Sequence, residues 1–363
     1  MKKKIANIGI IGCGRIAGHH CRAIKNNDNL KLTAVCDLDK AKAKLYQDEY
    51  NTIAFDNYHE MLETNPEIDT VAIITPSGMH FEHSIDILGN YKKNIIVEKP
   101  TFLRTSDFNS IQNLLNQNNL KLYPIFQNRH NNAVKRVKKA ITEKELGEVR
   151  IVSVRVRWCR PQRYYDLSEW RGTYAMDGGC LTNQGIHHLD LMRYLGGPIS
   201  SVSAKMNTMG SNIEVEDVVV GNVEYENGAL GSVEITTAAR PDDFEASISI
   251  VGSKGLAQIG GIAVNELQLF TPNPIECSKY SEDFSGNVYG NGHDKIYEEI
   301  VKDISNISPF SVSVNDAFNT IKLLNSFYVS NEKNKIIITN DSEGSSFLGR
   351  IDDSLSNLYR SKK

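Results

Sequence analysis

The chain has 363 residues, of which 40% are hydrophobic and 23% are charged, the composition of an ordinary globular protein. One hydrophobic core seldom organises so long a chain, so two domains are expected. Its 41 basic and 44 acidic side chains leave a formal net charge of -3, which argues against a protein that binds nucleic acid or an anionic membrane through bulk charge.

The N-terminus and the cysteines indicate where the protein works. Three lysines at positions 2–4 precede an apolar run that breaks at Gly12 with no cleavage site behind it, which is typical of a strand rather than a signal peptide. No stretch approaches the roughly 18 apolar residues of a membrane-spanning helix. The six cysteines are scattered without CxxC spacing, which favours free thiols. We expect a cytoplasmic protein with no membrane partner.

A nucleotide-binding turn is predicted near the N-terminus. Residues 12–17 spell GCGRIA between a predicted strand and a predicted helix, the context of a dinucleotide-binding fingerprint. In such a turn Gly12 permits the bend, Gly14 lets a pyrophosphate approach the backbone, and a small Ala17 lets helix and strand pack closely. Cofactor contacts are expected from five successive residues: Gly12, Cys13, Gly14, Arg15 and Ile16.

The next predicted strand, residues 30–36, leads into Asp37. A carboxylate at this position accepts hydrogen bonds from the ribose hydroxyls and repels a 2′-phosphate, so NAD is the expected cofactor. Lys40 and Lys42 keep NADP as a lesser alternative.

Strands and helices continue to alternate up to about residue 129. Strand-like segments at 68–76, 93–100 and 120–129 indicate an α/β fold with a parallel, doubly wound sheet of the Rossmann type, whose ligands bind outside the carboxyl ends of the strands. The residues at these ends are therefore expected to contact the cofactor: Thr75, Pro76, His80, Glu98, Lys99 and Gln127.

From Gly147 onward the hydrophobic pattern has a period of two, which predicts an α+β domain with a mostly antiparallel open sheet. We place the two domains at residues 1–124 and 125–363. The uncovered sheet face is available to a second subunit, so a homo-oligomer, either a dimer or a tetramer, is expected. Helices that cover the other face are expected at residues 179–195, 294–304 and 314–330.

Four motifs carry a family resemblance: GIIGCGRIAGHH, ITPSGMH, IIVEKP and GGCLTNQGIHHLD. Their order and spacing resemble the glucose-fructose oxidoreductase, inositol dehydrogenase and MocA family (Gfo/Idh/MocA) over nearly the whole chain. The resemblance implies an NAD-dependent oxidoreductase that acts on an alcohol carbon.

Further segments resemble a sugar-nucleotide subgroup of that family: QNRHNNAV, VRVRWCRPQRYYD, WRGT and TNQGIHH. Its members oxidise carbon 3 of a UDP-linked N-acetylglucosaminuronate to the 3-keto sugar in surface polysaccharide and lipopolysaccharide biosynthesis. A pyridoxal-phosphate aminotransferase acts next, and some relatives reoxidise NADH with 2-oxoglutarate. The resemblance therefore implies a UDP-sugar substrate and these partners.

Oxidation of a secondary alcohol by hydride transfer needs a base for the hydroxyl proton and a donor or cation for the developing charge. The resemblance implies that Lys99 and His187 share this work and contact the substrate. It also implies a cis Lys99–Pro100 bond.

Helical phase distinguishes the adjacent histidines. At about 100° per residue, His187 falls in a polar stripe with Asn183 and Asp190, whereas His188 falls between leucines. We expect His187 to face the cleft and His188 to pack in the core.

Asn183 departs from the pattern of much of the family, which has Asp four residues before this histidine. A neutral amide orients the ring or binds a substrate hydroxyl but does not stabilise an imidazolium. The subgroup has the same Asn, which implies a catalytic and substrate-binding Asn183 without a strict Lys-His-Asp relay.

Arginines in residues 155–163 suit an anionic substrate, because guanidinium groups pair with diphosphate and carboxylate. Arg160 and Arg163, in the loop after a predicted strand, are favoured over Arg155. For Tyr297, packing within the subunit is an equal alternative to substrate binding. The other expected contacts are Asn128, Arg129 and Tyr165 with the substrate, and Trp170 and Arg171 with the cofactor as they close over the cleft.

The nine histidines and the carboxylates show no metal-site spacing, so a metal-independent reaction is expected. One alternative is an inositol or other sugar dehydrogenase, or a keto-sugar reductase, although the arginines disfavour a small neutral polyol. Another is a non-catalytic dinucleotide-binding regulator, against which Lys99 and His187 argue.

Overall fold

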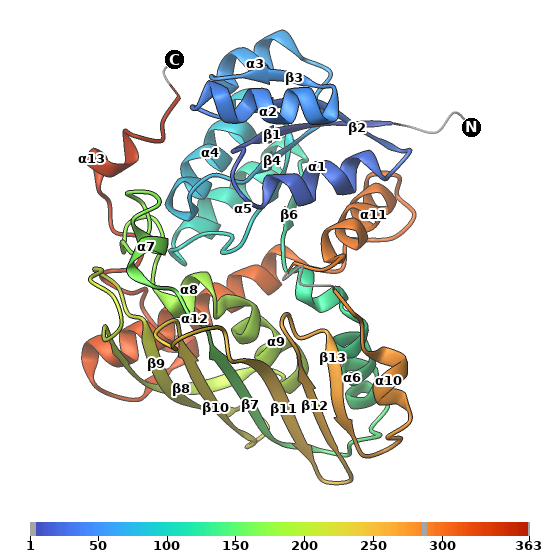
Figure 1. Ribbon diagram of the computed structural model, residues 1–363, viewed down its shortest axis with the longest axis vertical. Coiled ribbons are helices and arrows are strands. Elements are labelled where there is room, and N and C mark those ends of the chain that lie inside the picture. The colour runs from blue at the N-terminus through green and yellow to red at the C-terminus, as the bar shows by residue number, and fades with distance from the viewer. Residues whose placement is uncertain (1–4, 285–288, 362–363) are drawn as a thin grey trace. The chain divides into compact units, whose positions relative to one another are not determined.

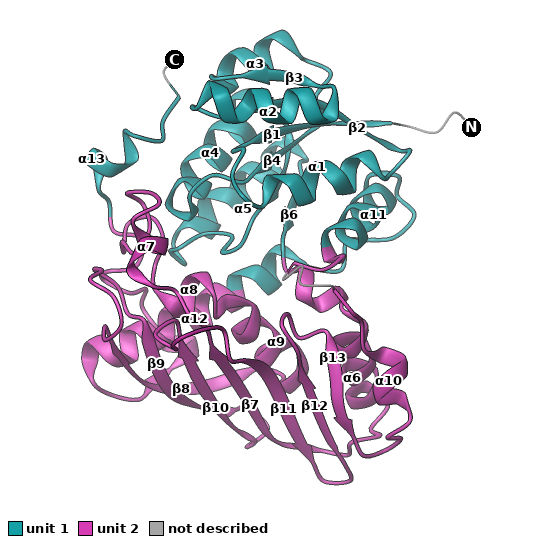
Figure 2. Cartoon of the chain, in the orientation of Figure 1, with its two compact units in different colours: residues 1–125, 293–318, 351–363 teal, residues 126–292, 319–350 magenta. Residues whose placement is uncertain are grey.

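The computed structural model describes residues 5–284 and 289–361. The chain forms two compact units, coloured separately in Figure 2. Unit 1 comprises residues 1–125, 293–318 and 351–363, and unit 2 comprises residues 126–292 and 319–350. The first crossing between the units therefore lies one residue from the expected boundary, but two later segments that we expected in the second domain belong to unit 1.

Unit 1 contains a six-stranded sheet in the order β3-β2-β1-β4-β5-β6, and every neighbouring pair is parallel (Figure 1). This is the strand order of a Rossmann fold, as the sequence predicts. The strands are β1 (Ala6–Ile11), β2 (Leu30–Cys36), β3 (Ile53–Phe55), β4 (Thr70–Ile73), β5 (Asn94–Val97) and β6 (Leu122–Pro124).

The helices of unit 1 pack their apolar sides on this sheet. The C-terminal helix α11 (Gly292–Ile304) joins them because Ile296, Tyr297 and Ile300 are buried in the same core cluster as Ile8. That shared core explains why a segment after residue 292 belongs to unit 1. The other helices of unit 1 are α1 (Ala17–Lys25), α2 (Lys40–Tyr50), α3 (Tyr58–Thr64), η1 (Ser77–Met79), α4 (His80–Asp86), η2 (Ile87–Tyr91), α5 (Asp107–Asn118) and α13 (Asp353–Ser356).

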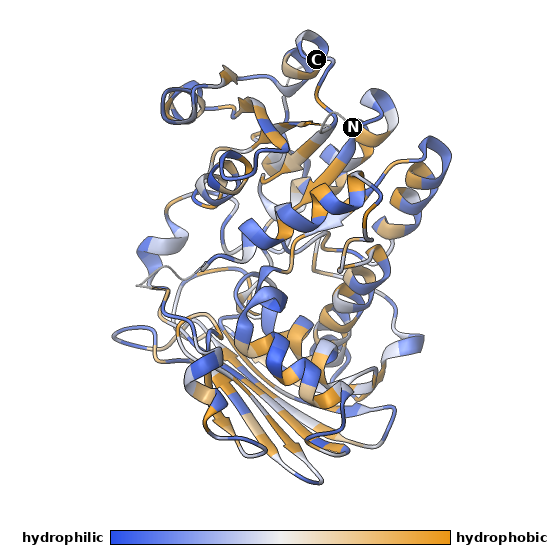
Figure 3. Ribbon diagram, turned by 90° about the vertical axis from the view of Figure 1, so that its right-hand side faces the viewer, coloured by the Kyte–Doolittle hydropathy of each residue, from blue (hydrophilic) through white to orange (hydrophobic). Residues whose placement is uncertain are grey.

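Unit 2 contains an eight-stranded sheet in the order β13-β12-β11-β7-β10-β9-β8-β14. It is antiparallel except where β7 pairs with β10, which confirms a mostly antiparallel sheet. Buried and exposed residues alternate along β9, and Figure 3 shows alternating hydropathy along the strands. The strands are β7 (Val149–Arg157), β8 (Ile199–Asn207), β9 (Val218–Tyr225), β10 (Leu230–Thr236), β11 (Glu245–Gly252), β12 (Leu256–Gly260), β13 (Glu266–Phe270) and β14 (Ile337–Ile338).

The helix expected over residues 179–195 is interrupted in the structure. It forms two helices that are separated at Gln184 and Gly185. Position 185 favours glycine, because a Cβ there would lie 2.6 Å from the Ile235 side chain of the sheet. Among the described residues, no helix has the length and apolar character to cross a membrane. The remaining helices are η3 (Gln127–His130), α6 (Asn132–Thr142), α7 (Gln162–Tyr165), α8 (Cys180–Asn183), α9 (Ile186–Gly196), α10 (Glu276–Tyr280), α12 (Val314–Lys333) and η4 (Thr339–Asp341).

The turn between β1 and α1 depends on one glycine. Gly12 has a φ of 100°, and a Cβ there would lie 2.6 Å from the carbonyl oxygen of Ile74. At Gly14, by contrast, a Cβ would meet no atom within 4 Å. Gly12 is therefore required by the fold, whereas Gly14 leaves open space beside the turn.

We expect Gly12→Ala to destabilise the protein by about 2 kcal/mol or more, because it adds backbone strain and a clash with backbone atoms. Thermal unfolding followed by circular dichroism measures this loss. Gly14→Ala is the matched control, and it should leave Tm nearly unchanged while weakening NAD binding. Equal Tm losses for the two variants would contradict this account of the turn.

Candidate active site

The turn of unit 1 has the features of a pyrophosphate site. The backbone N–H of Gly12 donates to the carbonyl of Cys36 at 2.8 Å, which ties the turn to β2. Helix α1 begins without a side-chain cap and with no acidic residue in its first turn, so its N-terminal dipole is left for an anion. Together with the open space at Gly14, these residues fit a dinucleotide.

Asp37 follows β2 beside this turn, as the sequence predicts. Its Oδ2 accepts from the N–H of Cys13 at 2.8 Å, and its Oδ1 accepts from the N–H of Asp39 at 2.9 Å. Each carboxylate oxygen has a second lone pair. Asp37 is thus held in one orientation and can still accept hydrogen bonds from ribose hydroxyls.

His80 does not lie on an open surface, as a direct cofactor contact would require. It is 1% exposed, and its Nδ1 and Nε2 each lie 2.9 Å from a carbonyl oxygen, of Pro100 and Thr75 respectively. The imidazole spans the ends of β4 and β5 from inside the unit, and its expected contact with the cofactor stays a prediction. Thr75 and Pro76, both half-exposed, remain at the surface of this edge.

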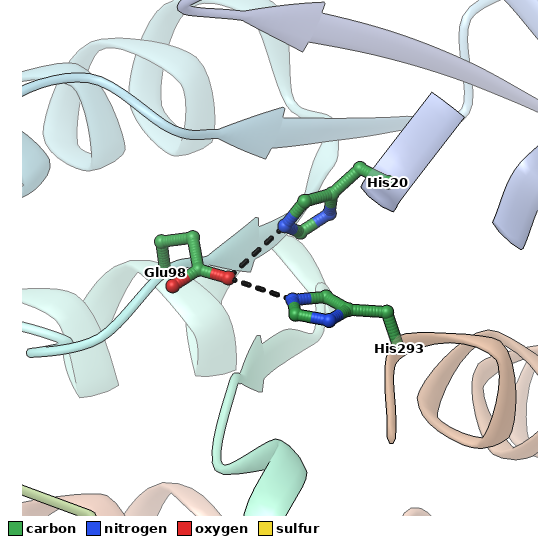
Figure 4. Close-up of side chains that lie close together, drawn as sticks. All are labelled: His20, Glu98 and His293. Carbon is green, nitrogen blue, oxygen red and sulfur yellow. Dashed lines mark hydrogen bonds and ion pairs between the residues drawn. The ribbon is translucent and has the colours of Figure 1, made fainter. Parts of the chain in front are cut away.

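Glu98 is also buried rather than presented to a ligand. Its Oε1 lies 3.0 Å from Nε2 of His20 and 3.1 Å from Nε2 of His293, as Figure 4 shows. Its Oε2 accepts from the backbone N–H of Lys99 at 3.0 Å. Burial opposes ionisation of Glu98, but the hydrogen bonds to His20 and His293 hold its pKa well below the usual value.

Lys99 itself is half-buried at the end of β5, and its bond to Pro100 is cis, as expected. Tyr297 is 0% exposed, and its hydroxyl lies 2.9 Å from Nδ1 of His20. This burial supports the alternative of packing within the subunit, and a substrate contact of Tyr297 stays untested.

In unit 2, the two adjacent histidines differ as the helical phase predicts. His187 is half-buried, and the amide nitrogen of Gln127 lies 3.2 Å from its Nε2, so this ring nitrogen accepts a hydrogen bond. His188 is 2% exposed, no described residue bonds to its ring nitrogens, and burial lowers its pKa to about 4. His188 is a neutral core residue.

Asn183 is half-buried like His187, and its amide donates to Oδ1 of Asp177. Asp177 is 2% exposed and also accepts from the N–H of Gly172 through Oδ2. Sequence analysis did not single out Asp177, because it lies six positions before Asn183 on a segment with no regular period. A buried carboxylate therefore orients the amide that replaces the family's aspartate.

Arg129 and Asp190 form a buried ion pair, although the sequence predicted Arg129 at the substrate and Asp190 on the polar stripe. Two bonds of 2.7 and 2.6 Å join them, and Thr320 donates to the same carboxylate at 2.9 Å. The guanidinium of Arg129 is occupied within the fold. The adjacent Asn128 is 9% exposed.

Tyr165 is likewise buried, with its hydroxyl 3.0 Å from that of Thr237. The neighbouring Tyr164 accepts instead from Arg171 at 2.6 Å. The Arg171 guanidinium lies 4.5 Å from the ring centres of both Tyr164 and Trp170, so these three side chains form one cation–π group. The cofactor contact that the sequence predicts for Trp170 and Arg171 stays a prediction.

The two favoured arginines have different surroundings. Arg160 donates to Asp243 at 2.8 Å and lies over the Trp158 ring. Arg163 is exposed, and no described residue pairs with it. Arg157, on the strand before this loop, pairs with Glu234 and Glu245 on neighbouring strands.

The residues missed by sequence analysis are brought together from distant parts of the chain. Separations of 78 and 195 positions divide Glu98 from His20 and from His293, so no local spacing reveals a group of metal-binding residue types. A weak signal existed in the four-residue interval between His293 and Tyr297, which puts both on one face of α11. A metal-independent reaction stays a prediction.

Two protein-family models match the sequence of this chain. An oxidoreductase family with an NAD-binding Rossmann fold matches residues 6–126, and the GFO/IDH/MocA C-terminal domain matches residues 134–258. The protein is thus an NAD-dependent oxidoreductase whose unit 1 binds the cofactor. It belongs to the Gfo/Idh/MocA family, which confirms the resemblance seen in the sequence.

The chain is 30% identical to the WlbA dehydrogenase from Bordetella pertussis, solved in complex with NADH and UDP-GlcNAcA, with a TM-score of 0.88 over 93% of this chain and 99% of that one. It is 26% identical to the glucose-6-phosphate 3-dehydrogenase of Bacillus subtilis over 68% of this chain and 72% of the relative. It is 30% identical to the inositol 2-dehydrogenase of Rhizobium meliloti over 68% and 73%, respectively. These relatives are sugar and inositol dehydrogenases.

A second buried carboxyl group lies against the segment that carries Asn183. Glu216 is 3% exposed, and its Oε1 accepts from the N–H of Leu181 at 3.1 Å and from the Tyr328 hydroxyl at 2.9 Å. No described residue bonds to Oε2. Burial raises the pKa of Glu216 from 4.5 to about 7, and these hydrogen bonds only partly offset it.

We expect Glu216 to make the protein less stable as the pH rises from about 4.5 to about 7, since the unfolded chain loses the proton there while the folded chain keeps it. Above this pH range, the free energy of unfolding is lower by about 3 kcal/mol than it is below the range. Glu216→Gln keeps the acceptor and removes the charge, so it should raise Tm at pH 8 and change it little at pH 4.5. A Tm difference that is the same at both pH values would contradict the buried-acid account.

Proposed function

We propose that this oxidoreductase oxidises the hydroxyl at carbon 3 of a UDP-linked N-acetylglucosaminuronate, in surface polysaccharide biosynthesis. The observation that carries the proposal is the likeness, over 93% of the chain, to a dehydrogenase solved with NADH and UDP-GlcNAcA. The 3-dehydrogenase named among the relatives supports oxidation at carbon 3. The proposal includes a homo-oligomer, an aminotransferase that uses the 3-keto product, and 2-oxoglutarate as an oxidant for NADH.

His187 and Lys99 carry the proposed reaction. NAD, when bound, accepts the hydride from the alcohol carbon. His187 takes the hydroxyl proton on Nε2 after the Gln127 amide, which donates to the single lone pair of this nitrogen, has rotated away. The rotated amide presents Oε1, for which no described residue is a partner. Lys99 contributes a cation that stabilises the negative charge developing on the oxygen.

The arginines fit the anionic groups of such a substrate. Arg163 is exposed and has no partner among the described residues, so its fork is available for a diphosphate or a carboxylate. Arg160 shares its guanidinium with Asp243, and Arg171 is held between two aromatic rings. Arg163 is therefore the first candidate for the substrate's negative charge.

The test is NADH formation by the purified protein with NAD and UDP-GlcNAcA, measured with and without 2-oxoglutarate. Mass spectrometry should show a product lighter by two hydrogens. UDP-GlcNAc tests the need for the carboxylate, while inositol and glucose 6-phosphate test the alternative that this is a dehydrogenase for inositol or another sugar. The proposal fails if one of these turns over while UDP-GlcNAcA gives no product under either condition.

Lys99→Ala and His187→Ala should each lower kcat by about 100-fold or more, because a cation and a base are removed from the reacting oxygen. His188→Ala is the matched control. It should lower Tm through a cavity in the core and leave kcat within a few-fold of the wild type at temperatures where it is folded. Loss of turnover in folded His188→Ala would mean that the two histidines have been assigned the wrong way round.

A further inference from the structure

Lys99 lies between two residues that buried histidines hold in unit 1. On the N-terminal side, Oε1 of the Glu98 carboxylate bonds to His20 and His293 (Figure 4). Its Oε2 accepts from the Lys99 N–H. On the C-terminal side, His80 lies 2.9 Å from the carbonyl oxygen of Pro100. The residues on both sides of Lys99 are therefore anchored to other elements of the unit.

The hydrogen-bond partners determine where the protons lie in this group. A carboxylate only accepts, so the Nε2 atoms of His20 and His293 both carry hydrogen. The other nitrogen of His20 then accepts from the Tyr297 hydroxyl, 2.9 Å away. The buried Glu98 carboxylate thus accepts two hydrogen bonds from imidazole rings.

This arrangement places a single negative charge at a defined point beside Lys99. Glu98, His20 and His293 are 5%, 0% and 0% exposed, so water screens the charge poorly. Lys99 is half-buried, and its side chain starts two bonds from the backbone nitrogen that the carboxylate binds. Among the described residues, the ionisable groups in this hydrogen-bonded group include Glu98 from the end of β5, His80 from α4, His20 from α1, and His293 and Tyr297 from α11.

We propose that His20 and His293 are positioning residues for Lys99, which act through Glu98 by holding its carboxylate in place as a fixed negative charge, while His80 anchors the Pro100 side. The proposal rests on the proposed function, in which Lys99 acts as a cation at the reacting oxygen. The fixed carboxylate favours the ammonium form of Lys99, and the anchored backbone aims it. His20 and His293 are the residue types that also bind metals, but their Nε2 hydrogens are used here by Glu98.

The first test compares His293→Leu with His293→Gln, and His20→Leu with His20→Gln. Glutamine keeps an N–H donor for Glu98, whereas leucine removes it. We expect the leucine variants to lower kcat by about 10- to 100-fold with a smaller change in KM, and the glutamine variants to recover most of that loss. Equal effects of leucine and glutamine would overturn the proposal.

The second test is the pH dependence of kcat in Glu98→Gln. Removing the negative charge makes the Lys99 ammonium lose its proton more easily, so the alkaline fall in activity should move down by about one pH unit. The matched control is His59→Leu, which replaces another buried histidine of unit 1 that bonds to Tyr91. It should lower Tm without moving the pH profile, and an unmoved profile in Glu98→Gln would overturn the proposal.

A measurement that does not need turnover separates this proposal from the proposed function. In protein labelled with ¹⁵N-lysine, the amide signal of Lys99 is the one that disappears in Lys99→Arg. It should shift in Glu98→Gln and His293→Leu and stay in place in His59→Leu. If these shifts occur but UDP-GlcNAcA is not oxidised, the proposed function fails and the anchoring of Lys99 stands; unshifted signals, or a stoichiometric metal ion in the purified protein, would overturn the anchoring.

Discussion

The buried carboxylate of Glu98 is the constraint on which the candidate site of unit 1 depends. An ionised carboxylate away from water costs several kcal/mol unless donors surround it. Here the donors come from α1, from α11 and from the peptide of Lys99. Helices α1 and α11 must therefore both be in place for the Glu98 carboxylate to be buried at the end of β5. The same requirement explains why α11 belongs to the unit that binds the cofactor.

Unit 2 follows the same physical rule with different groups. The Arg129–Asp190 pair is buried, and Thr320 from α12 completes it, so η3, α9 and α12 are joined by one satisfied ion pair. The polar groups that remain half-exposed along α8 and α9 include Asn183 and His187. The charges of Arg129 and Asp190 are thus neutralised within the fold, while Asn183 and His187 remain partly accessible. An unpaired charge near the reacting oxygen would shift the pKa of the catalytic base.

The parts of the site that were predictable are those set by local geometry. Gly12 and Asp37 belong to a strand-turn-helix-strand pattern whose meaning does not depend on the rest of the chain, and the Lys99–Pro100 segment lies at a strand end in both sequence and structure. The helical phase also separated His187 from His188, although Gly185 interrupts the helix, since both histidines lie within α9. The burial of His80 and Glu98 was not predicted, because a motif specifies position in the chain and not which side chain turns inward.

The amino-acid sequence by itself determined the fold class, the cofactor and the family, because periodicity and glycine placement act over a few residues and are read directly from the chain. Only the tertiary structure decided which charged and polar side chains became internal. Glu98 lies 78 positions from His20 and 195 positions from His293 in the chain. Nothing in the local sequence around these residues requires them to meet. Their pairing follows from the desolvation of a carboxylate, which is a property of the packed core and exists only once the strands and helices have assembled.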